Sequence, residues 1–190
     1  MVTRRVSAVR PPWQEGHFVG GHLVLDLTNT VFSRAQPVDE GELLKTSSDV
    51  LTWCVSSGLF DEIPVVPTNG LVQDVQTVRE QAWAVLDAVA CGAAPPPEPL
   101  GALLERAGAG VRTGHVHVDG TADWALPGAI PSALALMAVQ ALFTLPRDRL
   151  RACGRCGWLF LDSSRGGRRR WCSMSTCGNR EKASRHRVAG

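Results

Sequence analysis

Four of the six cysteines in this chain are spaced as the ligands of a metal ion. Two residues separate Cys153 from Cys156, four separate Cys172 from Cys177, and fifteen lie between the pairs. Each close pair can bring two sulfurs to one ion, and the insert can fold back to join the pairs. An all-sulfur ligand set favours zinc over magnesium or calcium. We therefore expect one structural Zn²⁺ whose four protein ligands leave no position open for catalysis.

The other two cysteines, Cys54 and Cys91, stand alone in the sequence. A secreted, disulfide-framed domain would distribute its cysteines through its whole length, and residues 1–12 contain no apolar signal segment. These observations favour a reducing, cytoplasmic location. Two disulfides, or free buried thiols, are the alternative reading of the cluster.

The segment that carries the cluster is strongly basic. Residues 147–190 contain 12 Lys and Arg against 3 acidic residues, whereas residues 1–146 contain 8 against 15. Eleven of the twelve cations are Arg, which suits bidentate contacts with phosphate or base edges. The candidate nucleic-acid contacts are Arg155, Arg165, Arg168, Arg169, Arg170, Arg180, Lys182, Arg185 and Arg187. As alternatives, residues 181–190 could be a solvated tail, and Arg180 could instead support the zinc site.

The elements that must position the cysteines can also be predicted. The alternating residues 158–161 predict a strand, residues 169–171 a returning strand, and residues 179–188 a short helix. The tight turns around the sulfurs suit Gly154, Gly157 and Gly178. Trp158 and Trp171 are expected in the core of this module.

The remainder of the chain predicts a helical body. Apolar spacing and end signals indicate helices over 49–57, 71–91, 100–107 and 131–145, and a hairpin over 111–126 that turns at Asp119-Gly120. Residues 22–31 fit either a strand or a helix. We expect a mainly α, α-dominated α+β fold, divided into an N-terminal arm (1–16), a multihelical body with a small β-hairpin (17–146) and a zinc finger with a basic tail (147–190).

One apolar stretch raises the alternative of a membrane span. Residues 125–146 contain no charged residue, and a stretch of this length could cross a bilayer. The stretch is rich in Ala and contains Pro127, Pro131 and Gln140, so a buried core helix is the favoured interpretation and no membrane partner is expected.

Three residues of the body are candidates for a ligand pocket. Asp26 and Asn29 lie in an otherwise apolar segment, where polar groups are costly unless they are paired. They could line a small-molecule pocket with Trp53, or they could satisfy backbone groups. No phosphate-binding glycine loop, nucleophile elbow or His-Glu-x-x-His motif is present, so we do not expect an enzyme.

The C-terminal motif resembles a known family. Trp171-Cys-Ser-Met-Ser-Thr-Cys177-Gly-Asn-Arg180, the preceding Gly157-Trp-Leu-Phe-Leu-Asp162 and the following Lys182 and Arg185-His-Arg187 are similar to the CGNR zinc finger. Residues 25–30, together with Leu51-Thr-Trp53 and Gly58-Leu59, are similar to the ABATE domain that is usually fused to it. The gap between Cys153 and Cys156 is shorter than in many relatives, which leaves the ligands intact. The resemblance implies a helical N-terminal domain, a DNA-binding finger and a role as a bacterial, stress-related transcription regulator.

The leading hypothesis is therefore a zinc-dependent DNA-binding regulator whose acidic body senses an effector or forms a homodimer. The alternatives are an RNA-binding finger, and a structural zinc module that mediates protein–protein interaction.

Overall fold

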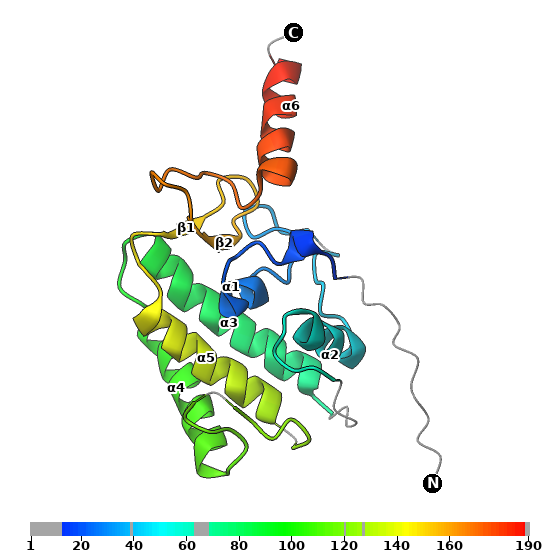
Figure 1. The fold of residues 1–190 in the computed structure, drawn as a ribbon, viewed down its shortest axis with the longest axis vertical. Helices are drawn as coiled ribbons and strands as arrows, with labels where there is room; N and C mark the ends of the chain where they lie inside the picture. Colours follow the sequence, from blue (N-terminus) through cyan, green and yellow to red (C-terminus); the bar gives the residue numbers. More distant parts are fainter. Residues whose placement is uncertain (1–12, 39, 63–68, 120, 127, 189–190) are drawn as a thin grey trace.

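The computed structural model describes residues 13–38, 40–62, 69–119, 121–126 and 128–188, with side chains as far as Arg185. Most of the described chain is helical, and a short hairpin lies between the helical body and the C-terminal helix (Figure 1). The elements, in chain order, are η1 (Glu15–His17), α1 (Leu23–Thr28), α2 (Ser47–Ser56), α3 (Leu71–Ala90), α4 (Pro97–Arg112), α5 (Ala129–Thr144), β1 (Leu150–Ala152), β2 (Leu159–Leu161), η2 (Met174–Gly178) and α6 (Asn179–Val188).

The body is built on α3, α4 and α5, which pack against one another, with α1 and α2 against α3. The apolar residues of α3 recur at helical spacing and are buried, as the sequence pattern predicts. Ala-rich α5 is buried over most of its length, and its small side chains allow close helix packing. In the described part of the chain, no helix is long and apolar enough to cross a membrane.

The ambiguous segment 22–31 forms helix α1. The ring of His22 caps its start, because Nδ1 accepts a hydrogen bond from the backbone N–H of Val24. Residues Val24–Thr28 are all buried. A helix buried on nearly every side has no polar face, so its apolar residues fit the alternation of a strand equally well.

Two expectations for the middle of the chain are wrong. Helix α4 runs from Pro97 to Arg112 and begins before the predicted residue 100, because Pro97 and Pro99 occupy its first turn, where no N–H is needed. It therefore includes the start of the expected hairpin over 111–126. Among the described residues of that segment, a single bridge joins Val116 to Ala122.

The two-stranded sheet lies in the C-terminal region, and the predicted partner of β2 is wrong. β2 pairs antiparallel with β1, with Leu150 opposite Leu161 and Ala152 opposite Leu159, and residues 169–171 form no strand. Successive side chains of a strand point to opposite faces. Leu159 therefore joins the core of the body, whereas Phe160 joins a second small core beside the cysteines.

Candidate zinc centre

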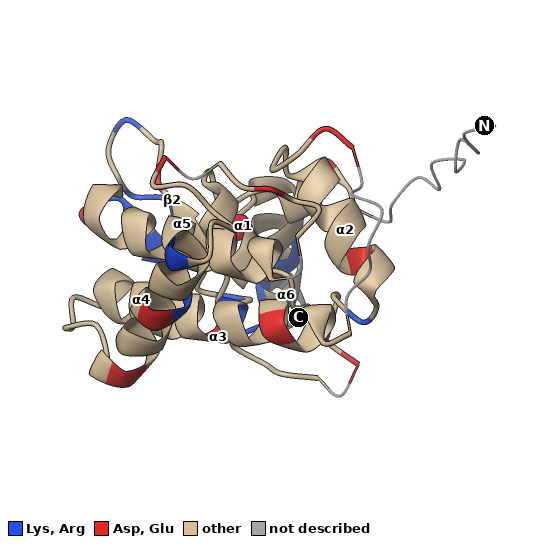
Figure 2. Cartoon of the chain, turned by 90° about the horizontal axis from the view of Figure 1, so that it is seen from below, with Lys and Arg blue, Asp and Glu red and all other residues tan. Residues whose placement is uncertain are grey.

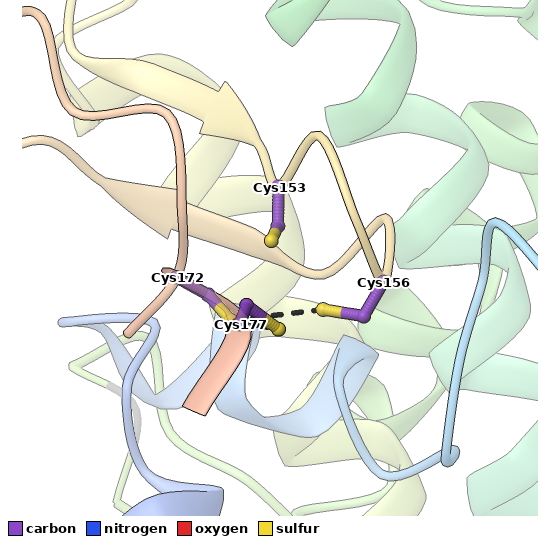
Figure 3. A group of neighbouring side chains, drawn as sticks. All are labelled: Cys153, Cys156, Cys172 and Cys177. Atoms are coloured by element: carbon purple, nitrogen blue, oxygen red, sulfur yellow. Dashed lines mark hydrogen bonds between the residues drawn. The ribbon is translucent and has the colours of Figure 1, made fainter. Parts of the chain in front are cut away.

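The structure brings the four predicted ligands together. The sulfurs of Cys153, Cys156, Cys172 and Cys177 all lie within 4.8 Å of one another, and their side chains converge from the end of β1, the β1–β2 turn and the region of η2 (Figure 3). The Cys156–Cys172 and Cys172–Cys177 sulfur distances are 3.6 and 3.7 Å. Zn–S bonds of about 2.3 Å in a tetrahedron place sulfurs about 3.8 Å apart. The cluster therefore fits one structural zinc ion, and none of the four cysteines is in a disulfide.

Local backbone bonds form the turn that holds the first pair. The N–H of Gly157 donates to the carbonyl of Cys153 over 2.9 Å, and the N–H of Cys153 donates to the carbonyl of Trp158 over 2.8 Å. Gly157 has a φ of +75°, in the left-handed region that favours glycine. The first pair thus lies directly on the end of the hairpin ladder.

Mutual contact governs the ionisation of the thiols. Hydrogen bonds from Cys156 and Cys172 lower the pKa of the Cys153 thiol. Hydrogen bonds with Cys153 and Cys156, together with burial, raise the pKa of the Cys172 thiol. Four thiolates this close repel one another, so full ionisation of the cluster needs a cation among them. Zn²⁺ meets that need, because it binds cysteine as the thiolate.

A small apolar core surrounds the sulfurs. Phe160 is fully buried, and Trp158, Trp171 and Val19 pack around it and the cysteines. The guanidinium of Arg169 lies 4.8 Å from the centre of the Phe160 ring and donates hydrogen bonds to the carbonyls of Trp171 and Cys172. Arg169, predicted as a nucleic-acid contact, is thus engaged within the zinc site.

One buried side chain of the body, that of Asn29, is hydrogen-bonded to the hairpin. Asn29 donates from Nδ2 to the carbonyl of Leu159 over 2.8 Å, and its Oδ1 accepts the N–H of the same residue over 2.9 Å. Next along β2, the N–H of Leu161 donates to the carbonyl of Gly20 over 2.8 Å. The edge of β2 that does not face β1 is therefore paired with the body.

The three candidate pocket residues lie in the interior. Asp26 accepts the N–H of Gly20 over 2.8 Å, and burial raises the pKa of its carboxyl to about 6. Asn29 uses both polar groups on Leu159, so these two residues satisfy backbone groups. Trp53 is fully buried, and its Nε1 has no partner in the described part of the chain. A ligand pocket at these residues stays a prediction.

The predicted nucleic-acid contacts divide into exposed and engaged cations. Arg155 pairs with Glu181 over 3.3 Å and is engaged, like Arg169. Arg185 is exposed although it also pairs with Glu181, over 3.1 Å. The predicted contact Arg187 lies beyond Arg185, the last residue whose side chain the structure describes. The other exposed candidates are Arg165, Arg168 and Arg170 between β2 and Cys172, and Arg180 and Lys182 on α6. Figure 2 colours the Lys and Arg positions of the described chain blue.

Asp162 closes the basic loop over residues 163–170. Its carboxylate accepts the N–H of Ser164 over 2.8 Å and that of Arg169 over 2.7 Å, and the Ser164 bond lowers the pKa of this carboxyl. The loop is thus fastened at both ends by one side chain. An Asp followed by two Ser residues is a turn signal, but the bond to Arg169 spans seven residues and has no local pattern.

These features define a class: a four-cysteine zinc module joined to a helical body. Two family models divide the chain between them. Residues 21–148 match ABATE, described as "putative stress-induced transcription regulator", and residues 149–188 match the CGNR zinc finger. The chain belongs to the ABATE family and carries a CGNR zinc finger, which confirms both resemblances. No curated protein matched the chain.

Proposed function

We propose that this protein is a zinc-dependent, DNA-binding transcription regulator. The CGNR finger contacts the duplex, and the ABATE body senses an effector or forms a homodimer. The protein works in a reducing compartment such as the bacterial cytoplasm, where the four thiols stay available for zinc, and it has no catalytic role.

The observation that carries the proposal is the position of the exposed cations on the two segments that flank the second cysteine pair. Arg168 and Arg170 lie on the loop that leads into Cys172, and Arg180 and Lys182 lie on α6, which begins two residues after Cys177. Zinc binding fixes both segments relative to each other. Arrays of Arg and Lys held in this way bind phosphates and release counterions from DNA.

The shape of α6 supports the same proposal. The helix has ten residues, or about 15 Å at 1.5 Å per residue, and it projects away from the body (Figure 1). A major groove about 12 Å wide admits an α-helix. Because α6 packs mainly on η2 and projects from the body, its sides are open to a groove.

The test is a fluorescence-anisotropy titration of zinc-loaded full chain against random-sequence duplex DNA at several salt concentrations. We expect binding at low salt that weakens steeply as salt rises. Arg168→Ala and Arg180→Ala should each weaken binding and reduce the magnitude of the salt slope by about one. Arg112→Ala removes an exposed cation from the end of α4 and is the matched control.

The proposal fails if the full chain does not bind duplex DNA at low salt, or if the finger variants bind as Arg112→Ala does. Competition with structured and single-stranded RNA adds a second criterion. RNA that displaces the duplex at equal concentration would overturn the DNA proposal in favour of an RNA-binding finger.

A further inference from the structure

The carbonyl of the zinc ligand Cys156 is surrounded by donors from the body. The backbone N–H groups of Arg34 and Ala35 donate to it over 2.6 and 3.1 Å, and the hydroxyl of Ser33 donates over 3.3 Å. These three donors come from the loop between α1 and α2, more than a hundred residues earlier in the chain. A carbonyl that accepts three hydrogen bonds is held firmly in place.

The same loop touches the two residues that follow Cys156. A Cβ at Gly157 would lie 2.8 Å from both the Ala35 nitrogen and the Arg34 Cβ, so the two backbones are in close contact. The indole Nε1 of Trp158 donates to the carbonyl of Val31 over 2.8 Å. The first cysteine turn is therefore packed against residues 31–35 along its length.

The side chain of Arg34 fixes this loop to the helices of the body. Its guanidinium donates to the carbonyl of Thr28, pairs with Glu80 on α3 and lies 4.8 Å from the ring of Trp83. It is only 10% exposed. One rigid side chain thus joins α1, α3 and the loop that holds Cys156.

We propose that Ser33, Arg34 and Ala35 form an outer shell of the zinc site, a body-derived clamp that holds Cys156 in position and slows the loss of zinc. Cys156 is the least buried of the four ligands, so it is the one most open to a competing chelator. Groups that orient a metal ligand from outside commonly change metal affinity by about 10–100-fold when they are removed. The inference concerns zinc retention and does not depend on DNA binding.

The test measures the rate at which zinc-loaded full chain transfers its metal to a chromogenic chelator. Arg34→Ala removes the anchor of the loop, and Trp158→Phe removes the Val31 hydrogen bond from the finger side. We expect Arg34→Ala to lose zinc about tenfold faster than the parent chain, and Trp158→Phe to lose it faster by a smaller factor. Because Trp158→Phe keeps an aromatic side chain and every backbone group, it tests the clamp even if Arg34→Ala does not fold.

Two control variants separate the clamp from general loosening. Arg106→Ala removes an Arg whose ion pair with Asp74 joins α4 to α3. Leu134→Ala creates a cavity in α5 and lowers stability at a fully buried position. Both should release zinc at close to the parental rate at a temperature where circular dichroism shows them folded. The proposal is overturned if Arg34→Ala and Trp158→Phe release zinc at the parental rate, or if Leu134→Ala accelerates release as much as they do.

Discussion

The two cysteine pairs would bind the same ion from very different surroundings. Cys153 and Cys156 lie on a hairpin that is bonded to the body through Asn29 and through the Cys156 carbonyl. The second pair, Cys172 and Cys177, lies between the basic loop and α6. Among the described elements, η2 is the one that α6 contacts extensively. Zinc thus joins an anchored pair, bound by the body, to a pair that depends on the metal for its place.

The difference suggests how the module works. Small metal modules rarely have enough apolar area to fold alone, so metal binding supplies much of their folding free energy. Here the body already stabilises one half of the module. The metal is therefore needed chiefly to fix Cys172, Cys177 and α6, because hydrogen bonds to Asp162 and from the Gly154 N–H to the Arg170 carbonyl already hold the basic loop.

The largest effect is expected from Cys172→Ser, which removes a ligand from the second pair. A structural zinc site contributes on the order of 10 kcal/mol to folding, so the variant should lose stoichiometric zinc. The segment from Cys172 through α6 should become sensitive to protease while the body stays folded, as metal analysis and limited proteolysis would show. Cys91→Ser is the control, because Cys91 is exposed and outside the cluster. Global unfolding of Cys172→Ser would contradict the division into an anchored and a dependent half.

Asn29→Leu should give the next largest effect, because it breaks the anchor of the first pair. The substitution leaves the buried N–H and carbonyl of Leu159 without partners, at about 1–3 kcal/mol for each group. We expect the free energy of unfolding to fall by about 2–6 kcal/mol in a denaturant titration. Thr52→Val is a control at a buried polar position whose hydroxyl bonds only within α2. Equal losses in the two variants would argue against a special role for Asn29.

Asp26→Asn should strengthen the anchored half. Burial raises the pKa of Asp26 to about 6 from 3.8, so the folded state binds a proton more tightly than the unfolded state. Ionising this carboxyl therefore lowers stability as pH rises from about 4 to about 6, and the penalty persists at neutral pH. The variant retains an acceptor for the Gly20 N–H and carries no charge. We expect a gain of about 1–2 kcal/mol at pH 7.

Thermal unfolding between pH 4 and pH 7 would check this prediction. Loss of zinc at low pH affects both chains alike, so the test is the difference between them. The gain in Asp26→Asn should be close to zero at pH 4 and should grow as pH rises to 7. Asp87→Asn is the comparison variant, because burial also raises the pKa of the Asp87 carboxyl, which lies near Arg34. An unchanged pH dependence in Asp26→Asn would show that the carboxyl is not the source.

The smallest effect is expected from Glu181→Gln in the dependent half. Glu181 pairs with Arg155 across the finger and with Arg185 along α6, but all three side chains are partly or largely exposed. Solvent-exposed ion pairs contribute about 0–1 kcal/mol. We expect unfolding free energy to change by less than about 1 kcal/mol, measured in low and high salt. A larger loss would mean that α6 is held by this carboxylate as well as by zinc.

The local parts of the site were predictable from sequence. The ligand spacing identified Cys153, Cys156, Cys172 and Cys177 because a tetrahedral ion restricts which cysteines can act together. Helix α6 has the predicted bounds of 179–188, and the apolar stripe of α3 is strong over twenty residues. In each case the information lies within one short segment.

The long-range parts were not predictable. The alternation of Leu159 and Phe160 indicates a strand, but it does not choose between residues 150–152 and 169–171 as the partner. Asn29 finds its partner 130 residues away, and an apolar segment with one Asn contains no signal for that distance. The hydrogen bonds from Arg34 and Ala35 to the Cys156 carbonyl come from backbone N–H groups, which almost every residue has.

The carboxylate of Asp162 bears on the proposed binding of DNA. Its two oxygens accept hydrogen bonds from the start and the end of the basic loop, so the loop is closed and ordered before any ligand binds. An open chain of the same residues would lose conformational freedom on meeting a polyanion, which reduces net affinity. In this protein much of that ordering occurs when the chain folds. One acidic residue among many basic ones would then strengthen the grip on a negatively charged partner, although it repels that partner directly.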